Sequence, residues 1–215
     1  DAAPFAVPKW QMSGWMPRAD VNPGETARNL MGFKDGTVNP APGSDSFAKI
    51  VWNTGAKHEW FAGGTTVAIR RIRMNLDLWD TVPPLMQEAA FGRHMVNGAP
   101  LGGTSEFQNP DLKAVDAKGA LVIPLDSHMR RSRKDEKILR RPFNYDDGLA
   151  TDGTPDAGLI FIAYAAELEQ YLAIQGSLAK LDAMNTWTTP VGSAMFVVPP
   201  GALEANHWVG EGLFA

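Results

Sequence analysis

The sequence contains no cysteine among its 215 residues. Thiolate-ligated haem, cysteine-bound iron–sulfur clusters, thiol nucleophiles and disulfide bonds are therefore excluded. No run approaches the roughly 18 apolar residues that a membrane helix requires, so we expect no membrane span. An excess of positive charge is also missing, because 20 Lys and Arg stand against 24 Asp and Glu, a net charge of −4. A general nucleic-acid binder needs a basic face, so nucleic acid is not an expected partner.

The chain does not start with methionine, and its first residues, Asp1-Ala2-Ala3-Pro4, carry no basic and apolar leader. We interpret it as a processed or truncated product. Its composition, with 44% hydrophobic and 20% charged residues, is ordinary for a globular protein. A chain of this length can bury a substantial core as one large domain or two small ones.

The pattern along the chain predicts an irregular arm or linker over residues 1–24, rich in Pro, Gly and Trp, and one domain over 25–215. Helices are expected at residues 25–31 (with Asn22 as N-cap and Pro23 in the first turn), 80–92 and 167–181. Strands are expected at 65–76, 121–125, 137–141, 158–164 and 193–198, and a long loop at 97–119. Because helices and strands interleave without regular βαβ units, we predict an α+β fold on an antiparallel sheet.

One of the four histidines stands out by its position. His128 follows the expected buried strand 121–125, and a side chain at the end of a sheet is well placed to meet a ligand. The alternative is a structural histidine that bonds only to its neighbours.

Basic residues gather just after this histidine, between Arg130 and Arg141. A solvated basic turn would explain them. Within the expected strand, however, Arg140 and Arg141 point to opposite faces, so one of them turns inward and needs an anionic partner. A bound anion or a carboxylate-bearing cofactor would meet that need. A third candidate, Asp35, lies in Gly32-x-x-Asp35-Gly36, which an ordinary Asp-Gly turn would also explain.

Three segments together resemble one known family. Residues 29–37 resemble the GxxDG signature of the dye-decolourising peroxidases, 126–130 the family's haem-ligand segment, and 138–145 the strand that carries its distal arginine. The likeness covers nearly the whole chain and is strongest to the exported bacterial branch, which includes the deferrochelatase group. It implies a ferredoxin-like α+β domain of the dimeric α+β-barrel type, an exported protein whose signal has already been removed, and an N-terminal half that is a separate chain or a lost segment.

The resemblance also assigns roles to residues. It implies haem b, with His128 as the proximal iron ligand, and Asp35 and Arg140 as the catalytic pair that meets hydrogen peroxide on the distal side. An organic electron donor would be the second substrate. Further haem contacts are expected from Gly36, Thr37, Val38, Arg70, Arg133 and Arg140. The segment between His128 and Arg140 departs from the family pattern, since it is shorter and lacks an Asn-Pro-Arg stretch.

Several alternatives remain open at this point. Arg70 could be an exposed strand arginine, and the carboxylate that supports His128 could be Asp152 or Glu167. The same haem contacts would serve a deferrochelatase-type module that handles haem or iron without significant peroxidase turnover. A sensor or assembly domain with an empty pocket is a third reading. A homo-oligomer is also compatible with the sequence.

Overall fold

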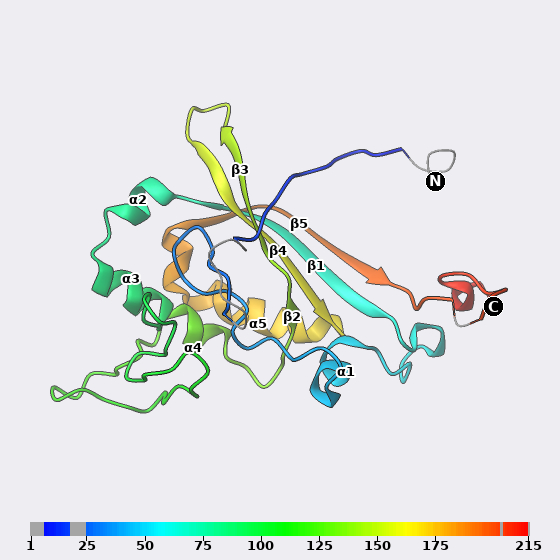
Figure 1. Ribbon diagram of the computed structural model, residues 1–215, viewed down its shortest axis with the longest axis horizontal. Coiled ribbons are helices and arrows are strands. Elements are labelled where there is room, and N and C mark those ends of the chain that lie inside the picture. Colours follow the sequence, from blue (N-terminus) through cyan, green and yellow to red (C-terminus); the bar gives the residue numbers. More distant parts are fainter. Residues whose placement is uncertain (1–6, 18–24, 203, 215) are drawn as a thin grey trace.

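The computed structural model describes residues 7–17, 25–202 and 204–214, and its centre is an antiparallel five-stranded sheet (Figure 1). The strand order is β2-β4-β1-β5, and β3 also pairs with β4. The sheet contains two β–α–β units, one from β1 to β2 and one from β4 to β5. In each unit a strand of the other unit lies between the two strands, which is the ferredoxin-like arrangement. The predicted α+β fold is confirmed. The strands are β1 (Thr65–Met74), β2 (Leu139–Arg140), β3 (Phe143–Leu149), β4 (Pro155–Ala165) and β5 (Thr188–Val198).

Five α-helices and three short 3-10 turns complete the described chain. The helices are α1 (Asp45–Val51), α2 (Leu76–Asp80), α3 (Pro84–Phe91), α4 (His128–Ser132) and α5 (Leu168–Leu181). The 3-10 turns are η1 (Glu59–Phe61), η2 (Ala183–Thr186) and η3 (Glu211–Leu213). Glu167 and Gln170 form a capping box that starts α5, and Gly92 ends α3 in the left-handed region at φ 84°. No helix of the described residues is long and apolar enough to cross a membrane.

The sheet has one face under helices and one that stays partly open. Ala68 of β1 and Ala163 of β4 are buried against Tyr171 of α5. Because side chains alternate along a strand, Ile69 and Ile162 point to the opposite face, where they are only half-buried. The edge strand β5 is exposed almost throughout, although its sequence is apolar near its end.

The main core joins the covered face of the sheet to the loop that contains the GxxDG motif. Trp79 is 2% exposed and packs edge-on against Phe33, Phe91 and Trp187. Its indole Nε1 donates to the Met31 carbonyl oxygen at 3.2 Å. The buried members of this cluster are Met31, Phe33, Met74, Trp79, Ala90, Leu159 and Met184. The motif loop is therefore built on the core.

The helix predicted at residues 25–31 is wrong. The Asn29 side chain accepts hydrogen bonds from the backbone amides of Met31 and Phe33, and such local bonds compete with helix formation. Arg28 instead pairs with Lys34 in an isolated bridge. The expected cap at residues 22–23 lies outside the described residues.

The strand predicted at residues 121–125 is also wrong. Leu121 makes only an isolated bridge to Val115, and Leu125 is 60% exposed. The Arg130 guanidinium donates to the carbonyl oxygens of Ile123 and Pro124, so a side chain satisfies backbone groups that a sheet would otherwise pair. The strand expected at 137–141 is reduced to β2, and α1, α2 and β3 were not predicted.

Candidate functional site

The residues on either side of Asp35 fix the loop that carries it. Phe33 is 1% exposed and stacks on Phe91 with 3.8 Å between ring centroids. The Asp35 amide donates to the Ala27 carbonyl oxygen at 2.9 Å. Gly36 has φ 110°, a conformation that side-chain-bearing residues rarely adopt, so the loop turns immediately after Asp35. The Asp35 side chain is thereby held at 13% exposure.

Asp35 and Arg140 form an ion pair across 105 residues of sequence. Arg140 Nη2 lies 3.1 Å from Asp35 Oδ1, and the arginine side chain is 24% exposed. Arg141 is exposed, so Arg140 is the one of the two arginines that turns inward. Asn39 fixes the backbone of Arg140 from the same loop, since its Nδ2 donates to the Arg140 carbonyl at 2.7 Å and its Oδ1 accepts from the Arg140 amide at 2.9 Å.

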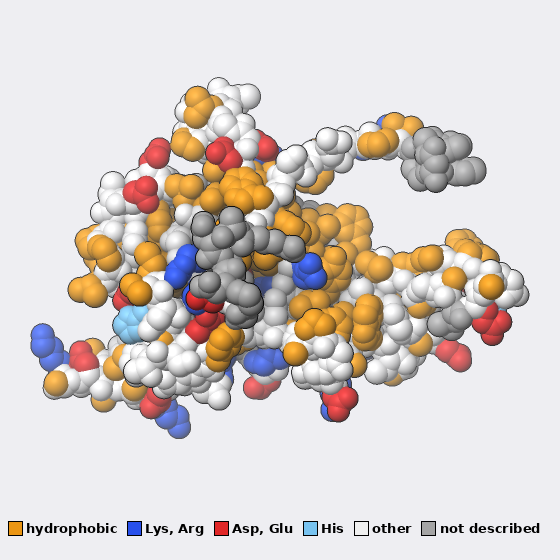
Figure 2. All heavy atoms as spheres, viewed as in Figure 1, with side chains coloured by type: hydrophobic (Ala, Val, Ile, Leu, Met, Phe, Trp, Pro, Cys, Tyr) orange, Lys and Arg blue, Asp and Glu red, His pale blue; other side chains and the backbone are white. Residues whose placement is uncertain are grey.

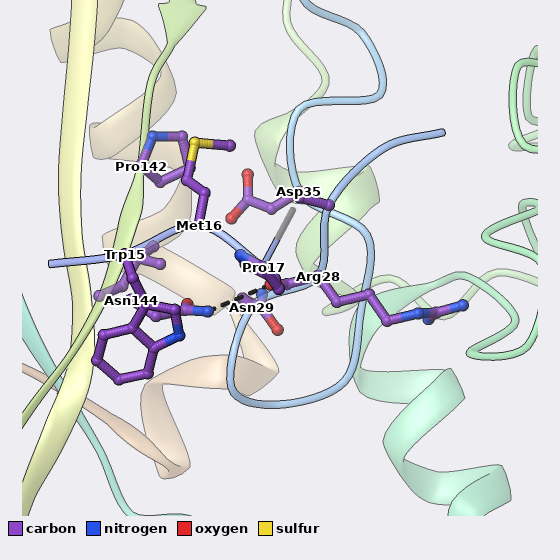
Figure 3. Close-up of a pocket in the computed structure, with 10 residues that line it drawn as sticks. Trp15, Met16, Pro17, Arg28, Asn29, Asp35, Pro142 and Asn144 are labelled. Carbon is purple, nitrogen blue, oxygen red and sulfur yellow. Dashed lines mark hydrogen bonds between the residues drawn. The ribbon is translucent and has the colours of Figure 1, made fainter. Parts of the chain in front are cut away.

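One oxygen of the Asp35 carboxylate remains available. Asp35 Oδ1 is buried, yet no donor of the described residues completes a hydrogen bond to it, since the Arg140 contact has the distance but not the geometry. Asp35 also lines a cavity of about 10 Å³, which has room for about one water-sized molecule. Figure 3 shows its carboxylate directed toward Met16 and Pro142 in that cavity. This oxygen can therefore accept a hydrogen bond from a small molecule in the cavity.

His128 begins α4 and is not at the end of a strand as predicted. The preceding Ser127 is completely buried, and a Cβ on Gly92 would lie 3.0 Å from its Oγ, so the glycine helps α3 and α4 to pack closely here. His128 Nδ1 lies 2.7 Å from Oδ2 of Asp182, which is 4% exposed. An ionised carboxylate only accepts, so Nδ1 donates in this contact, and in the neutral imidazole Nε2 then keeps its lone pair for a metal ion.

The expected carboxylate partners of His128 are therefore wrong. Asp152 bonds to Thr154 in an exposed turn, and Glu167 caps α5 and pairs with Lys57. Asp182 was missed because it directly follows α5, 54 residues after His128. Nothing in the local sequence marks such a distant partner.

Aromatic rings connect the His128 region with the Asp35 loop. The ring centroid of Phe91 lies 5.9 Å from that of His128, and Phe91 also stacks on Phe33, two residues before Asp35. The two halves of the candidate site thus share one packed layer, and neither can move freely without the other.

Arginine side chains also gather near the pair. Burial lowers the pKa of Arg93, the nearby charge of Glu106 opposes this, and the positive charges of Arg140 and Arg133 lower the pKa further. Arg93 therefore lies within electrostatic range of both Arg140 and Arg133. Such a cluster favours an anion in its neighbourhood. Sequence reasoning had not singled out Arg93.

The other predicted site residues are more dispersed. Thr37 donates to Glu106, and Val38 is 64% exposed. Arg133 is exposed, and its Nη2 lies 3.3 Å from Oδ1 of Asn109. Arg70 of β1 donates to Gln175 at 2.6 Å and to Ser193 at 3.2 Å. No bond among the described residues links Arg70 to Asp35, His128 or Arg140.

Known proteins match this chain along most of its length. A deferrochelatase of Escherichia coli (strain UTI89) is 39% identical over 199 residues, which is 88% of this chain and 46% of the relative. The chain thus spans about half the length of the curated relatives it matches. The structure of DtpA from Streptomyces lividans, a mixed oxyferrous and water complex, superposes with a TM-score of 0.88 at 39% identity, covering 96% of this chain and 58% of that one.

A second solved structure gives the same result. A DyP-type peroxidase from Cellulomonas bogoriensis superposes with a TM-score of 0.85 at 39% identity, over 93% of this chain and 56% of its own. The family model for the C-terminal part of Dyp-type peroxidases matches residues 26–203. This range contains Asp35, His128 and Arg140, together with the Asp182 carboxylate. The chain therefore belongs to the Dyp-type peroxidase family, as a C-terminal domain of it.

Proposed function

We propose that this chain is the haem-holding part of a peroxidase that reduces hydrogen peroxide and oxidises bulky one-electron donors such as dyes or phenols. One observation carries the proposal: a histidine whose Nδ1 is bonded to a buried carboxylate, with Nε2 left for a metal ion, shares one packed layer with a partly buried Asp–Arg pair. The two pairs suit different chemistry. Histidine is a residue type that commonly binds metal ions, whereas the Asp35–Arg140 pair is suited to proton transfer and charge stabilisation.

The residues present fit haem b. His128 would bind the iron through Nε2, and its bond to Asp182 raises the basicity of the imidazole and fixes its orientation. The cluster of Arg93, Arg133 and Arg140 suits the carboxylates of a porphyrin, because a guanidinium pairs with a carboxylate through two parallel bonds. When bound, haem supplies the redox chemistry of the reaction.

On the distal side the chain's own residues would act on the peroxide. Asp35 would take a proton at its unbonded Oδ1 and return it to the departing oxygen. Arg140 would stabilise the negative charge that develops as the O–O bond breaks. The cavity beside Asp35 has room for about one water-sized molecule and excludes a bulky donor. Bulky donors would therefore deliver electrons from outside the cavity.

A second function is favoured by the deferrochelatase relative. In that case His128 and the arginines would hold haem for delivery or iron handling, with little peroxide turnover. The Asp35–Arg140 pair supports the peroxidase instead, because a carrier does not need a carboxylate with an unbonded buried oxygen. Replacing Asp35 alone would abolish peroxidase activity but leave haem binding intact, since the haem contacts proposed above do not include Asp35.

We also propose that a partner half covers the open face of the sheet. The chain spans only 46% of its relative, and on this face the helices of the described residues leave apolar side chains half-buried or exposed. They include Ile69, Ile162, Tyr164, Phe196 and Val198. Figure 2 shows hydrophobic side chains around the notch between the extended N-terminal arm and the far end of the sheet. Export of the whole protein is part of the proposal and rests on the resemblance to the exported branch.

A hemin titration followed by absorption tests the proposal. The wild-type chain should develop a Soret band typical of histidine-ligated ferric haem, and His128→Ala should lose it. His58→Ala is the matched control, because His58 is an exposed histidine outside the candidate site. If excess hemin gives the same spectrum in all three proteins, His128 is not the ligand and the proposal is refuted.

A further inference from the structure

Glu106 lies in the middle of the long loop at residues 97–119, yet its side chain is only 7% exposed. Its two carboxylate oxygens have different partners. Oε2 accepts from Lys34 Nζ at 2.6 Å, and Oε1 accepts from Thr37 Oγ1 at 3.0 Å. These two residues lie on either side of Asp35 in the sequence. One carboxylate therefore holds both flanks of the loop that presents Asp35.

The segment around Glu106 is itself anchored. Arg93 Nη1 donates to the Glu106 carbonyl oxygen at 3.0 Å and to the Gly98 carbonyl oxygen at 2.6 Å. Burial alone would raise the pKa of Glu106, but hydrogen bonds from Lys34, Thr26 and Thr37 hold it below the usual range. The carboxylate is thus charged at neutral pH, and it is attached to a rigid support.

The other end of the Asp35 loop is fixed by a different contact. Asn39 bonds to both backbone polar groups of Arg140, so the loop is tied to β2 at one end and to Glu106 at the other. We infer that Glu106 is a positioning residue that holds the Asp35 loop against Arg140. This inference rests on the proposed function for its catalytic consequence, while its structural part concerns the chain alone.

Glu106→Gln separates the charge from the shape of the side chain. The amide oxygen can still accept from Thr37, but Lys34, which is 11% exposed, loses its counter-charge. The reversed pair Lys34→Glu with Glu106→Lys restores opposite charges at the same two places. Asp111→Asn is the matched control, because it removes a negative charge from an exposed position of the same long loop.

Hydrogen exchange of backbone amides reads the loop directly and needs no haem. The Asp35 amide donates to Ala27 and the Asn39 amide donates to Gly36. In Glu106→Gln these two amides should exchange about tenfold faster, while the amides that pair β1 with β4 keep their rates. Asp111→Asn should match the wild type, and the reversed pair should recover most of the protection.

The same variants extend the test to the hemin-loaded protein. Glu106→Gln should bind hemin as tightly as the wild type but react with hydrogen peroxide about tenfold more slowly or worse, because misplacing a catalytic group by about 1 Å costs up to about a hundredfold. Faster exchange in the loop without any hemin binding would leave the positioning role standing and refute the proposed function. Unchanged exchange at Asp35 and Asn39, or an equal rise throughout the sheet, would overturn the inference.

Discussion

Replacing Asp182 with asparagine tests how the protein holds His128. Oδ1 of Asp182 accepts from the Met184 amide at 3.0 Å, while Oδ2 lies 2.7 Å from His128 Nδ1. An asparagine keeps the first bond but turns its NH₂ group toward Nδ1. His128 then has to move its proton to Nε2, the nitrogen that would bind iron. If the amide flips instead, the Met184 bond is lost.

The size of the effect follows from the burial and the charge of this bond. Asp182 is 4% exposed, and hydrogen bonds to charged groups contribute about 1.5–3 kcal/mol. Loss of an outer-shell partner of a metal-bound histidine typically weakens metal binding about 10–100-fold. That range corresponds to about 1.4–2.7 kcal/mol, so the two figures agree. We therefore expect hemin to bind Asp182→Asn about 10–100-fold more weakly than the wild type.

Hemin titration at neutral pH, followed at the Soret band, measures this difference. Asp126→Asn is the control, since it removes the same charge from an exposed position two residues before His128. Circular dichroism verifies that both variants are folded. If Asp182→Asn binds hemin within about twofold of the wild type, the Asp182 carboxylate does not support the ligand and the reasoning is refuted.

Three further predictions concern the distal pair and the core. Arg140→Leu should slow the reaction with peroxide more than Asp35→Asn, because it also leaves a buried carboxylate without its counter-charge; stopped-flow rates in the opposite order would contradict this. Gly158→Ala should destabilise the fold by about 3 kcal/mol or more, since its Cβ would collide with a backbone carbonyl oxygen of β1. At Gly176 of α5 an added Cβ meets open space, so Gly176→Ala should stabilise the fold by about 0.5–1 kcal/mol. Urea denaturation measures both, and equal effects would refute the packing argument. Trp79→Ala should cost about 3–5 kcal/mol in the same assay, and a loss below about 1 kcal/mol would show that Trp79 is not central to the core.

The parts of the fold that local pattern could predict are the long regular elements. Val67 and Ile69 alternate with smaller or charged residues in β1, and the apolar spacing of α5 repeats over 14 residues. The run at residues 121–125 was equally apolar but failed as a strand. Arg130 lies only five residues after the run, and its guanidinium satisfies the carbonyl groups of Ile123 and Pro124. The pattern of apolar residues contains no information on hydrogen bonds from a side chain to the backbone.

The candidate site divides in the same way. Asp35, His128 and Arg140 were identified from motifs and the resemblance. Alternation predicted that one of the two neighbouring arginines turns inward, and the structure shows that this one is Arg140. Asp182 was missed, because it meets His128 only through the packing of α4 against α5. Glu106 was missed for the same reason, since its loop folds back over the motif from about 70 residues away.

The two hydrogen bonds between the Asn39 side chain and the backbone of Arg140 have a consequence for sequence variation in the family. These bonds fix the position of the Arg140 backbone. The length of the connection between α4 and β2 therefore does not determine where Arg140 lies. Insertions and deletions between Arg133 and Ile138 can then accumulate while the arginine keeps its place. A change in the length of this connection should therefore leave the position of Arg140 unaltered.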